Sequence, residues 1–103
     1  MAGIKTLITY PKSANFKADY YTATHLPLVK KTWGPSGFIS AELLDHSKDD
    51  SSPFSYSLII TWKDENSPRA AFADPATKQV IDDIPNFSSE KPTIFSGAVV
   101  HQV

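Results

Sequence analysis

The sequence predicts an α+β fold with the ferredoxin-like order β-α-β-β-α-β, in which helices cover one face of a four-stranded antiparallel sheet. A length of 103 residues suits one domain, expected over residues 1–103. Apolar and polar residues alternate through Phe54–Trp62, as in a strand, and apolar residues recur at helical spacing between residues 16 and 33. Apolar residues also fall on both faces of the predicted strands, so we expect two copies to pair their sheets into a dimeric α/β barrel. The alternative is a monomer with a few exposed apolar side chains.

Prolines and glycines set the predicted boundaries of the first elements. A first strand is predicted over Ile4–Tyr10, because Pro11 removes a backbone donor. A helix is predicted from about Phe16 to Trp33, where Gly34-Pro35 ends it. Pro27 lies inside this helix and its ring crowds the preceding turn, so we expect a kink just after His25.

The remaining predicted elements follow from alternation, turn residues and caps. In order they are a strand over Phe38–Asp45, a polar loop over His46–Pro53, a strand over Phe54–Trp62, a short helix over Arg69–Ala73, a helix that starts at Asp74-Pro75 and runs to about Asp83, and a strand over roughly Thr93–Val100. No internal repeat or linker interrupts this order.

Composition excludes several functional classes. The net charge is −1 and the basic residues are dispersed, so nucleic-acid binding is not expected. The chain has no cysteine, which excludes disulfides and thiolate chemistry. Neither a secretory signal nor an apolar run of membrane-spanning length is visible, so we expect no membrane association and a cytoplasmic location.

Cofactor sites are not expected either. The four glycines are dispersed and form no phosphate-binding loop. His46 and His101 make no metal-ligand spacing with His25, so no metal site is predicted.

Two motifs resemble those of a known family, the EthD-like proteins, which are named for a component of ether-degrading gene clusters. One is Phe16-x-x-x-Tyr20-Tyr21-x-x-x-His25-x-Pro27-Leu28, and the other is the segment Asp82-Asp83-Ile84-Pro85-Asn86-Phe87. The resemblance covers nearly the whole chain and implies a dimeric barrel. Related barrels include lactone isomerases, cofactor-free monooxygenases, haem-degrading enzymes and enzymes that tailor aromatic polyketides, so it does not specify a reaction.

The candidate catalytic residues are His25, Tyr21 and Asp83. A histidine that faces a barrel cavity is suited to proton exchange near neutral pH, and Tyr21 lies one turn earlier on the same stripe. The alternative is a buried histidine that only holds the helix in place. Asp82 and Asp83 end a helix, where negative charge is unfavourable, so at least one of them is expected to have a specific partner.

The candidate substrate-binding residues are mostly aromatic, as in many small-molecule sites. For each of them core packing is the alternative role, and for the asparagine a hydrogen bond within its turn. They are Tyr10, Trp33, Tyr56, Trp62, Asn86 and Phe87.

The primary functional hypothesis is a homodimeric, cofactor-independent enzyme that transfers a proton on a small hydrophobic, aromatic or lactone-type compound. Isomerisation, dehydration, decarboxylation and cofactor-free oxygenation remain open as its reaction. The alternatives are a non-catalytic barrel that binds or carries a hydrophobic molecule, haem binding through His25, and a purely structural dimer.

Overall fold

A computed structural model describes residues 3–103 and contains the elements in the predicted order. The strands are β1 (Ile4–Pro11), β2 (Phe38–Asp45), β3 (Phe54–Trp62) and β4 (Thr93–Ala98). They form one sheet in the order β2-β3-β1-β4, and each neighbouring pair is antiparallel. The predicted ferredoxin-like α+β fold is therefore confirmed.

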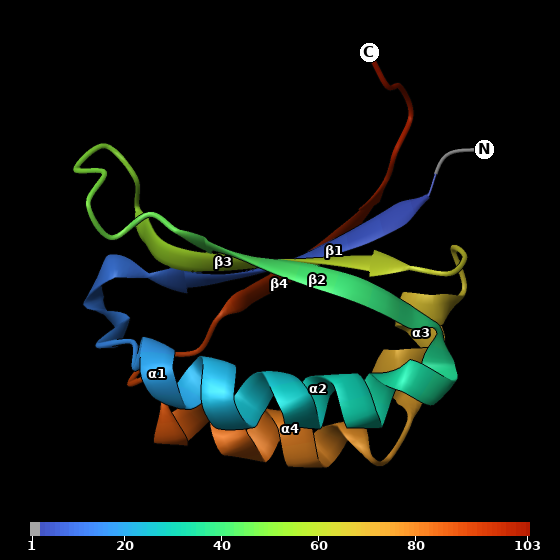
Figure 1. Ribbon diagram of the computed structural model, residues 1–103, viewed down its shortest axis with the longest axis horizontal. Helices are drawn as coiled ribbons and strands as arrows, with labels where there is room; N and C mark the ends of the chain where they lie inside the picture. Colours follow the sequence, from blue (N-terminus) through green and yellow to red (C-terminus); the bar gives the residue numbers. More distant parts are fainter. Residues whose placement is uncertain (1–2) are drawn as a thin grey trace.

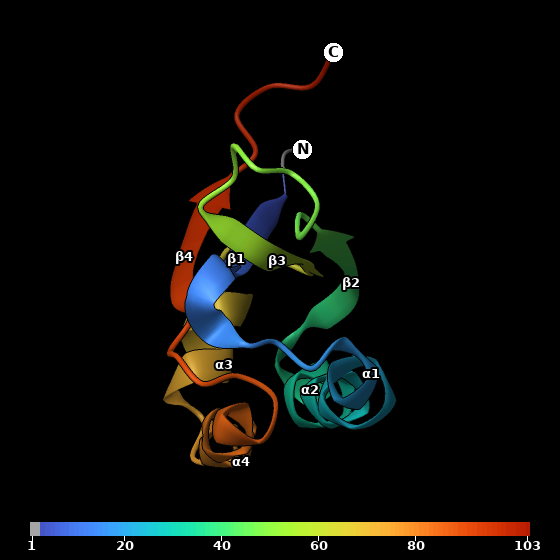
Figure 2. The same cartoon turned by 90° about the vertical axis from the view of Figure 1, so that its left-hand side faces the viewer.

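The helices lie on one face of this sheet. A continuous helical segment consists of α1 (Ala18–Tyr20), a π-helical turn (Tyr21–His25) and α2 (Leu26–Trp33), and α3 (Ser67–Ala73) and α4 (Thr77–Asp83) follow β3. Short 3₁₀ turns occupy Lys12–Ala14, Gly34–Ser36 and Ile84–Asn86. Figures 1 and 2 show α2 and α4 side by side beneath the sheet, while the C-terminal segment leads away on the opposite side.

Several predicted boundaries are wrong by one or two residues. β1 extends one residue further, to Pro11, α3 begins at Ser67 instead of Arg69, and β4 ends at Ala98 instead of Val100. Helix α4 begins at Thr77, after Asp74-Pro75, because these two residues belong to a turn. Asp74 Oδ1 accepts a hydrogen bond from the Ala76 N–H at 2.9 Å in that turn, and this satisfies a donor ahead of the helix.

The irregularity predicted near Pro27 takes the form of a wide turn. The Leu26 N–H donates to the Tyr21 carbonyl, five residues back, and this closes the π-helical turn. Pro27 then lies in the first turn of α2, where a proline needs no helical N–H partner. We had expected a kink just after His25, but His25 and Leu26 keep helical backbone angles and no sharp break occurs there.

Strand alternation determines which side chains enter the core. Ile8 and Tyr10 of β1 and Leu58, Ile60 and Trp62 of β3 are buried against the helices. On the other face, Leu7 of β1 pairs in register with Ile59 of β3 and with Phe95 of β4, which is 48% exposed. The helix-free face thus carries a row of apolar side chains across three strands.

Candidate functional site

The candidate site lies where α2 and α4 meet beneath the sheet. His25 is the last residue of the π-helical turn, and its side chain is only 3% exposed. Asp83 is the last residue of α4, and its side chain is 12% exposed. Asp83 Oδ2 lies 2.8 Å from Nδ1 of His25, so the two residues form a hydrogen bond between the two helical segments.

Asp83 accepts two further hydrogen bonds through its other oxygen. The Tyr20 hydroxyl donates to Oδ1 at 2.6 Å, and the Asn86 side-chain amide donates to the same atom at 2.9 Å. Asp83 is therefore the partnered carboxylate that its place at a helix C-terminus predicts. Asp82, by contrast, points outward and forms an exposed ion pair with Lys78, one turn earlier.

The pKa shifts of the pair favour an ionised carboxylate beside a neutral imidazole at pH 7. Burial lowers the pKa of His25, and the hydrogen bond and charge of Asp83 offset only part of that effect. For Asp83, burial raises the pKa, but the hydrogen bonds from Tyr20, Asn86 and His25 together outweigh it and lower the pKa below its ordinary value. Neutral imidazole and carboxylate are the states that a base and its orienting partner require.

These protonation states define the tautomer of His25. An ionised carboxylate only accepts hydrogen bonds, so Nδ1 carries the hydrogen and Nε2 carries the free lone pair. Nε2 makes no hydrogen bond to the described residues. It is not fully buried either, because between residues 3 and 103 the only fully buried side-chain polar atom without a partner is the Tyr21 hydroxyl. Nε2 therefore keeps some contact with the surface and is available as a proton acceptor.

An aromatic cluster packs around His25 on the side of the sheet. The ring of His25 lies 4.4 Å from Phe87 and 5.0 Å from Tyr21, measured between centroids. Tyr10 reaches the same cluster from β1, with its centroid 5.5 Å from Phe87. Tyr56 of β3 joins it through a stacked contact with Phe16, a residue that sequence reasoning did not assign to the site.

The Tyr21 hydroxyl is the unusual member of this cluster. The side chain is fully buried, and its oxygen makes no hydrogen bond of normal geometry within residues 3–103. Burial raises the pKa of Tyr21 far above its ordinary value, and the charge and hydrogen bonding of the neighbouring Tyr10 hydroxyl add to the shift, so the phenol stays neutral. A buried hydroxyl without a good hydrogen bond costs about 1–3 kcal/mol, so a better partner than Tyr10 would stabilise Tyr21.

Trp33 and Trp62, two of the predicted pocket walls, lie elsewhere. Their rings are 5.8 Å apart and both contact Phe72 in a second aromatic cluster. Trp33 Nε1 donates to Thr77 and Trp62 Nε1 donates to Thr6, so each indole has a structural partner. Trp33 is eight residues after His25 on the helical segment, about 12 Å along its axis. The structure therefore does not bring these tryptophans to the candidate site.

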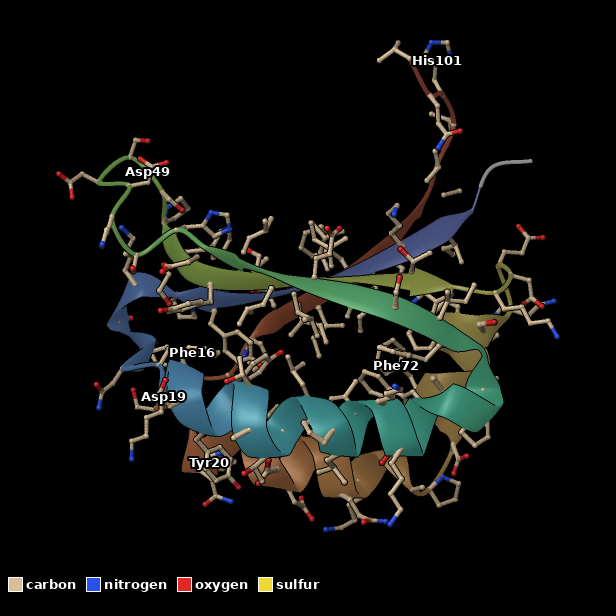
Figure 3. The ribbon with its side chains drawn as sticks, in the orientation of Figure 1. Phe16, Asp19, Tyr20, Asp49, Phe72 and His101 are labelled. Carbon is tan, nitrogen blue, oxygen red and sulfur yellow. The ribbon has the colours of Figure 1, made fainter. Side chains whose placement is uncertain are left out.

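Tyr20 is the site residue that sequence reasoning missed. Its hydroxyl bonds Asp83, and this hydrogen bond, with smaller effects of burial and the Asp83 charge, raises the pKa of Tyr20. The available signal was its position beside Tyr21 in the first motif. Figure 3 shows Tyr20 at the outer end of the paired helices and Phe16 between helix and sheet.

Two open grooves flank the paired helices. One, of about 520 Å³, lies between α4 and β4 and includes Ile81, Ile84 and Ile94 in its lining. The other, of about 600 Å³, lies between α2 and β2 and includes Leu26 and Phe38. We had expected His25 to face a cavity, but His25 lines neither of these two grooves.

Other polar clusters and helices in the described region supply no competing site. Between residues 3 and 103, no three His, Asp or Glu side chains converge as potential metal ligands. Within the same residues, no helix combines the length and apolar character needed to cross a bilayer. His46 bonds Ser57 at 2.9 Å on the helix-free face, away from the Asp83 pair.

The fold and the buried Asp83–His25 pair define an α+β protein of the ferredoxin-like class with a candidate proton-transfer site. The sequence profile of the EthD domain matches residues 12–91, a span that contains every residue of the pair and its partners. The chain belongs to the EthD domain family. A search of curated proteins gives no match.

Solved structures show the same fold at low sequence identity. An EthD-like protein from Ralstonia eutropha JMP134 is 24% identical with a TM-score of 0.78, over 100% of this chain and 96% of that one. SnoaB, a cofactor-independent oxygenase from Streptomyces nogalater, is 15% identical with a TM-score of 0.65, over 100% and 96%. A dimeric ferredoxin-like protein of unknown function from Thermobifida fusca YX is 11% identical with a TM-score of 0.62, over 95% and 92%.

Proposed function

We propose that this protein is a cofactor-independent enzyme that transfers a proton on a small hydrophobic, aromatic or lactone-type compound. The observation that carries the proposal is the part-buried hydrogen bond between Asp83 and His25, which leaves Nε2 unprotonated and without a partner among residues 3–103. Tyr20 and Asn86 hold the carboxylate from its other side. This arrangement orients a base through a buried carboxylate, as in acid–base sites generally.

The proposed step is proton abstraction by Nε2 of His25. The substrate loses a proton from an acidic C–H beside a carbonyl, or from a phenolic O–H, and keeps the electron pair as an enolate or phenolate. The resulting imidazolium is stabilised by Asp83, which accepts the Nδ1–H bond throughout. Return of the proton to another atom gives isomerisation, and expulsion of a leaving group gives elimination.

The electrostatics support this role over that of a merely structural histidine. Any hydrogen-bond acceptor would hold a structural imidazole, and a backbone carbonyl is the commonest. Here the acceptor is a carboxylate with three donors and a lowered pKa, so its negative charge persists at pH 7 and favours a transient imidazolium. SnoaB shows that this fold accommodates a cofactor-independent oxygenase.

The test is proton exchange with solvent. Native protein and the His25→Ala and Asp83→Asn variants are incubated in D₂O with lactones, phenols and polyketide-like aromatics, and deuterium uptake is followed by mass spectrometry. We expect uptake with the native protein, and a fall of about 10²-fold or more in each variant, which is the usual contribution of a positioned acid–base group.

A matched control is His46→Ala, because His46 is also half-buried and hydrogen-bonded but lies on the other face of the sheet. It should exchange at the native rate. Equal exchange in native protein and His25→Ala would remove His25 from the chemistry. Binding of a panel compound without any exchange would favour a non-catalytic carrier.

We also propose that two copies pair through the helix-free face of the sheet. The apolar row Phe95, Leu7 and Ile59 lies there, and Leu44 on the same face is 42% exposed. Burying these side chains against a second copy removes apolar area from water. The similar Thermobifida fusca protein is described as dimeric, which supports a dimer for this chain as well.

A further inference from the structure

Phe16 occupies a singular position in the aromatic cluster beside His25. Its ring contacts four other rings, with centroid distances of 4.5 Å to Tyr56, 4.8 Å to Tyr21, 4.9 Å to Tyr10 and 5.5 Å to Phe87. Three of those four residues are almost completely buried, whereas Phe16 and Tyr56 are only half-buried. Phe16 therefore covers the inner rings at the surface of the cluster.

The backbone of Phe16 is held less tightly than that of the residues on either side of it. Asn15 has a φ of 49°, the only left-handed conformation of a non-glycine residue between residues 3 and 103. Residues 15–17 belong to no helix or strand, and Phe16 makes no backbone hydrogen bond to the described residues. The bonds that secure this segment lie on either side, from the Lys17 N–H to Phe87 and from the Ser89 N–H to Ala14.

The rings beneath Phe16 contain an unsatisfied polar atom. Within residues 3–103 the Tyr21 hydroxyl has no hydrogen bond of normal geometry, only the neighbouring Tyr10 hydroxyl, and the ring of Tyr21 is in contact with Phe16. Removal of the Phe16 ring would leave a space of aromatic size, walled by Tyr10, Tyr56 and Phe87. If Tyr21 only filled space in the core, a phenylalanine would serve without the cost of burying a hydroxyl.

We propose that Phe16 is a gate over a binding pocket for a single neutral aromatic ring that bears an oxygen, of the phenol class. The ligand ring replaces Phe16 against Tyr56, where the present rings stack at an interplanar angle of 24°. The ligand oxygen accepts a hydrogen bond from the Tyr21 hydroxyl. Phe16 moves outward on the segment of residues 15–17.

Charge favours a neutral ligand over an aromatic carboxylate. Tyr10 and Tyr21 stay neutral because burial raises the pKa of both, and Tyr56 and Phe87 add no positive charge. Of the ionised groups near this cluster, Asp83 is negative and is turned toward His25, and Lys17, which follows Phe16, is exposed. A carboxylate in this pocket would be desolvated without a cationic partner, which is strongly unfavourable.

The gate deepens the proposed proton transfer by naming its substrate class, and it rests on that proposal for its biological purpose. Its test measures binding alone, so a protein without catalytic activity can still pass it. Binding of phenol, toluene and benzoate is measured by NMR titration and calorimetry with the native protein, Phe16→Ala and Phe72→Ala. Phe72 is a matched control, because it is a partly exposed aromatic residue of the other cluster.

Phe16→Ala should bind phenol at least tenfold more tightly than the native protein, because the ligand no longer displaces a ring, whereas Phe72→Ala should bind it with native affinity. In the Phe16→Ala background, phenol should be preferred to toluene by about fivefold or more, the value of satisfying a buried hydroxyl. Adding Tyr21→Phe should abolish that preference. Circular dichroism verifies folding, and Phe16→Leu replaces Phe16→Ala if the latter does not fold.

Three results would overturn the inference. Equal phenol affinity in the native protein and both Phe16 variants would show that Phe16 does not cover a pocket. An equal gain in Phe72→Ala would show a general effect of cavity formation. A preference for benzoate, or a phenol preference that survives Tyr21→Phe, would assign the pocket to a different ligand chemistry.

Discussion

Asp83 holds the junction of the two helical segments, and its removal should destabilise the protein far more than removal of the adjacent Asp82. The Asp83→Ala variant loses the acceptor of three side-chain hydrogen bonds, from Tyr20, His25 and Asn86. Asp82→Ala loses only an exposed ion pair with Lys78. The two carboxylates are neighbours at the same helix end, so the comparison isolates the hydrogen bonds.

The magnitude follows from the burial of each donor. His25 is nearly fully buried, so its Nδ1–H cannot turn to water, and an unsatisfied buried donor costs about 1–3 kcal/mol. Tyr20 and Asn86 are closer to the surface and can exchange Asp83 for water. Removing a negative charge from a helix C-terminus returns about 0.3–1 kcal/mol. The net loss for Asp83→Ala is therefore about 1–2 kcal/mol.

Urea unfolding at pH 7.5, followed by tryptophan fluorescence, measures this loss. Trp33 and Trp62 lie in the other aromatic cluster, so their signal reports unfolding without direct influence from the substitution. A urea dependence of about 1–3 kcal/mol per M turns the expected loss into a midpoint about 1 M lower. Protein concentration is held constant, because dimerisation would otherwise change the midpoint. If Asp83→Ala and Asp82→Ala unfold at the same midpoint, the pair does not hold the helices together.

Three further predictions follow from particular residues. Burial keeps the pKa of His25 below 6.5, so just below pH 6.5 the unfolded chain binds a proton that the folded chain does not, and stability decreases as the pH is lowered. The urea midpoint of the native protein should therefore drop more between pH 7.5 and pH 5.5 than that of His25→Gln. Parallel drops in the two proteins would contradict the lowered pKa of His25. Trp33→Phe loses the hydrogen bond to Thr77, so the free energy of unfolding measured in urea should fall by about 1–3 kcal/mol while the rate of deuterium exchange stays unchanged. A loss of exchange equal to that of His25→Ala would place Trp33 in the site. Leu7→Asp on the helix-free face should convert a dimer into a monomer in light scattering, whereas Ile81→Asp on α4 should not, and a dimer that survives Leu7→Asp would exclude this face as the interface.

The fold could be predicted because local signals agreed with one another. Alternation identifies β3 and separates its buried residues from the opposite face, and both bounds of β3 match the prediction. Pro11 and Gly34-Pro35 end the first strand and the long helix near their predicted positions. Helix starts were predicted less well, because the turn at Asp74 binds backbone donors before the helix begins.

The candidate site was only partly predictable. Tyr21 and His25 share a helical stripe, and an aspartate at a helix C-terminus requires a partner, but these local rules do not identify His25 as the partner of Asp83. Trp33 lies on the same helical segment, but its position along the axis separates it from His25. Trp62 also lies apart from His25, because β3 extends past both clusters and carries Tyr56 to one and Trp62 to the other.

Tyr20 was missed because regular helical spacing places it off the stripe that contains Tyr21 and His25. Adjacent residues of an α-helix point about 100° apart, so a stripe that contains Tyr21 and His25 excludes Tyr20. Tyr20 and His25 nevertheless contact the same residue of α4, because Asp83 accepts a hydrogen bond from His25 with one oxygen and from Tyr20 with the other. The π-helical turn that begins at Tyr21 ends just before Pro27, where the missing N–H of proline prevents a regular pattern. Such turns often occur at functional sites. Here the turn lies beside the carboxylate–histidine pair, with Tyr20 bonded to Asp83 and the ring of Tyr21 in contact with His25.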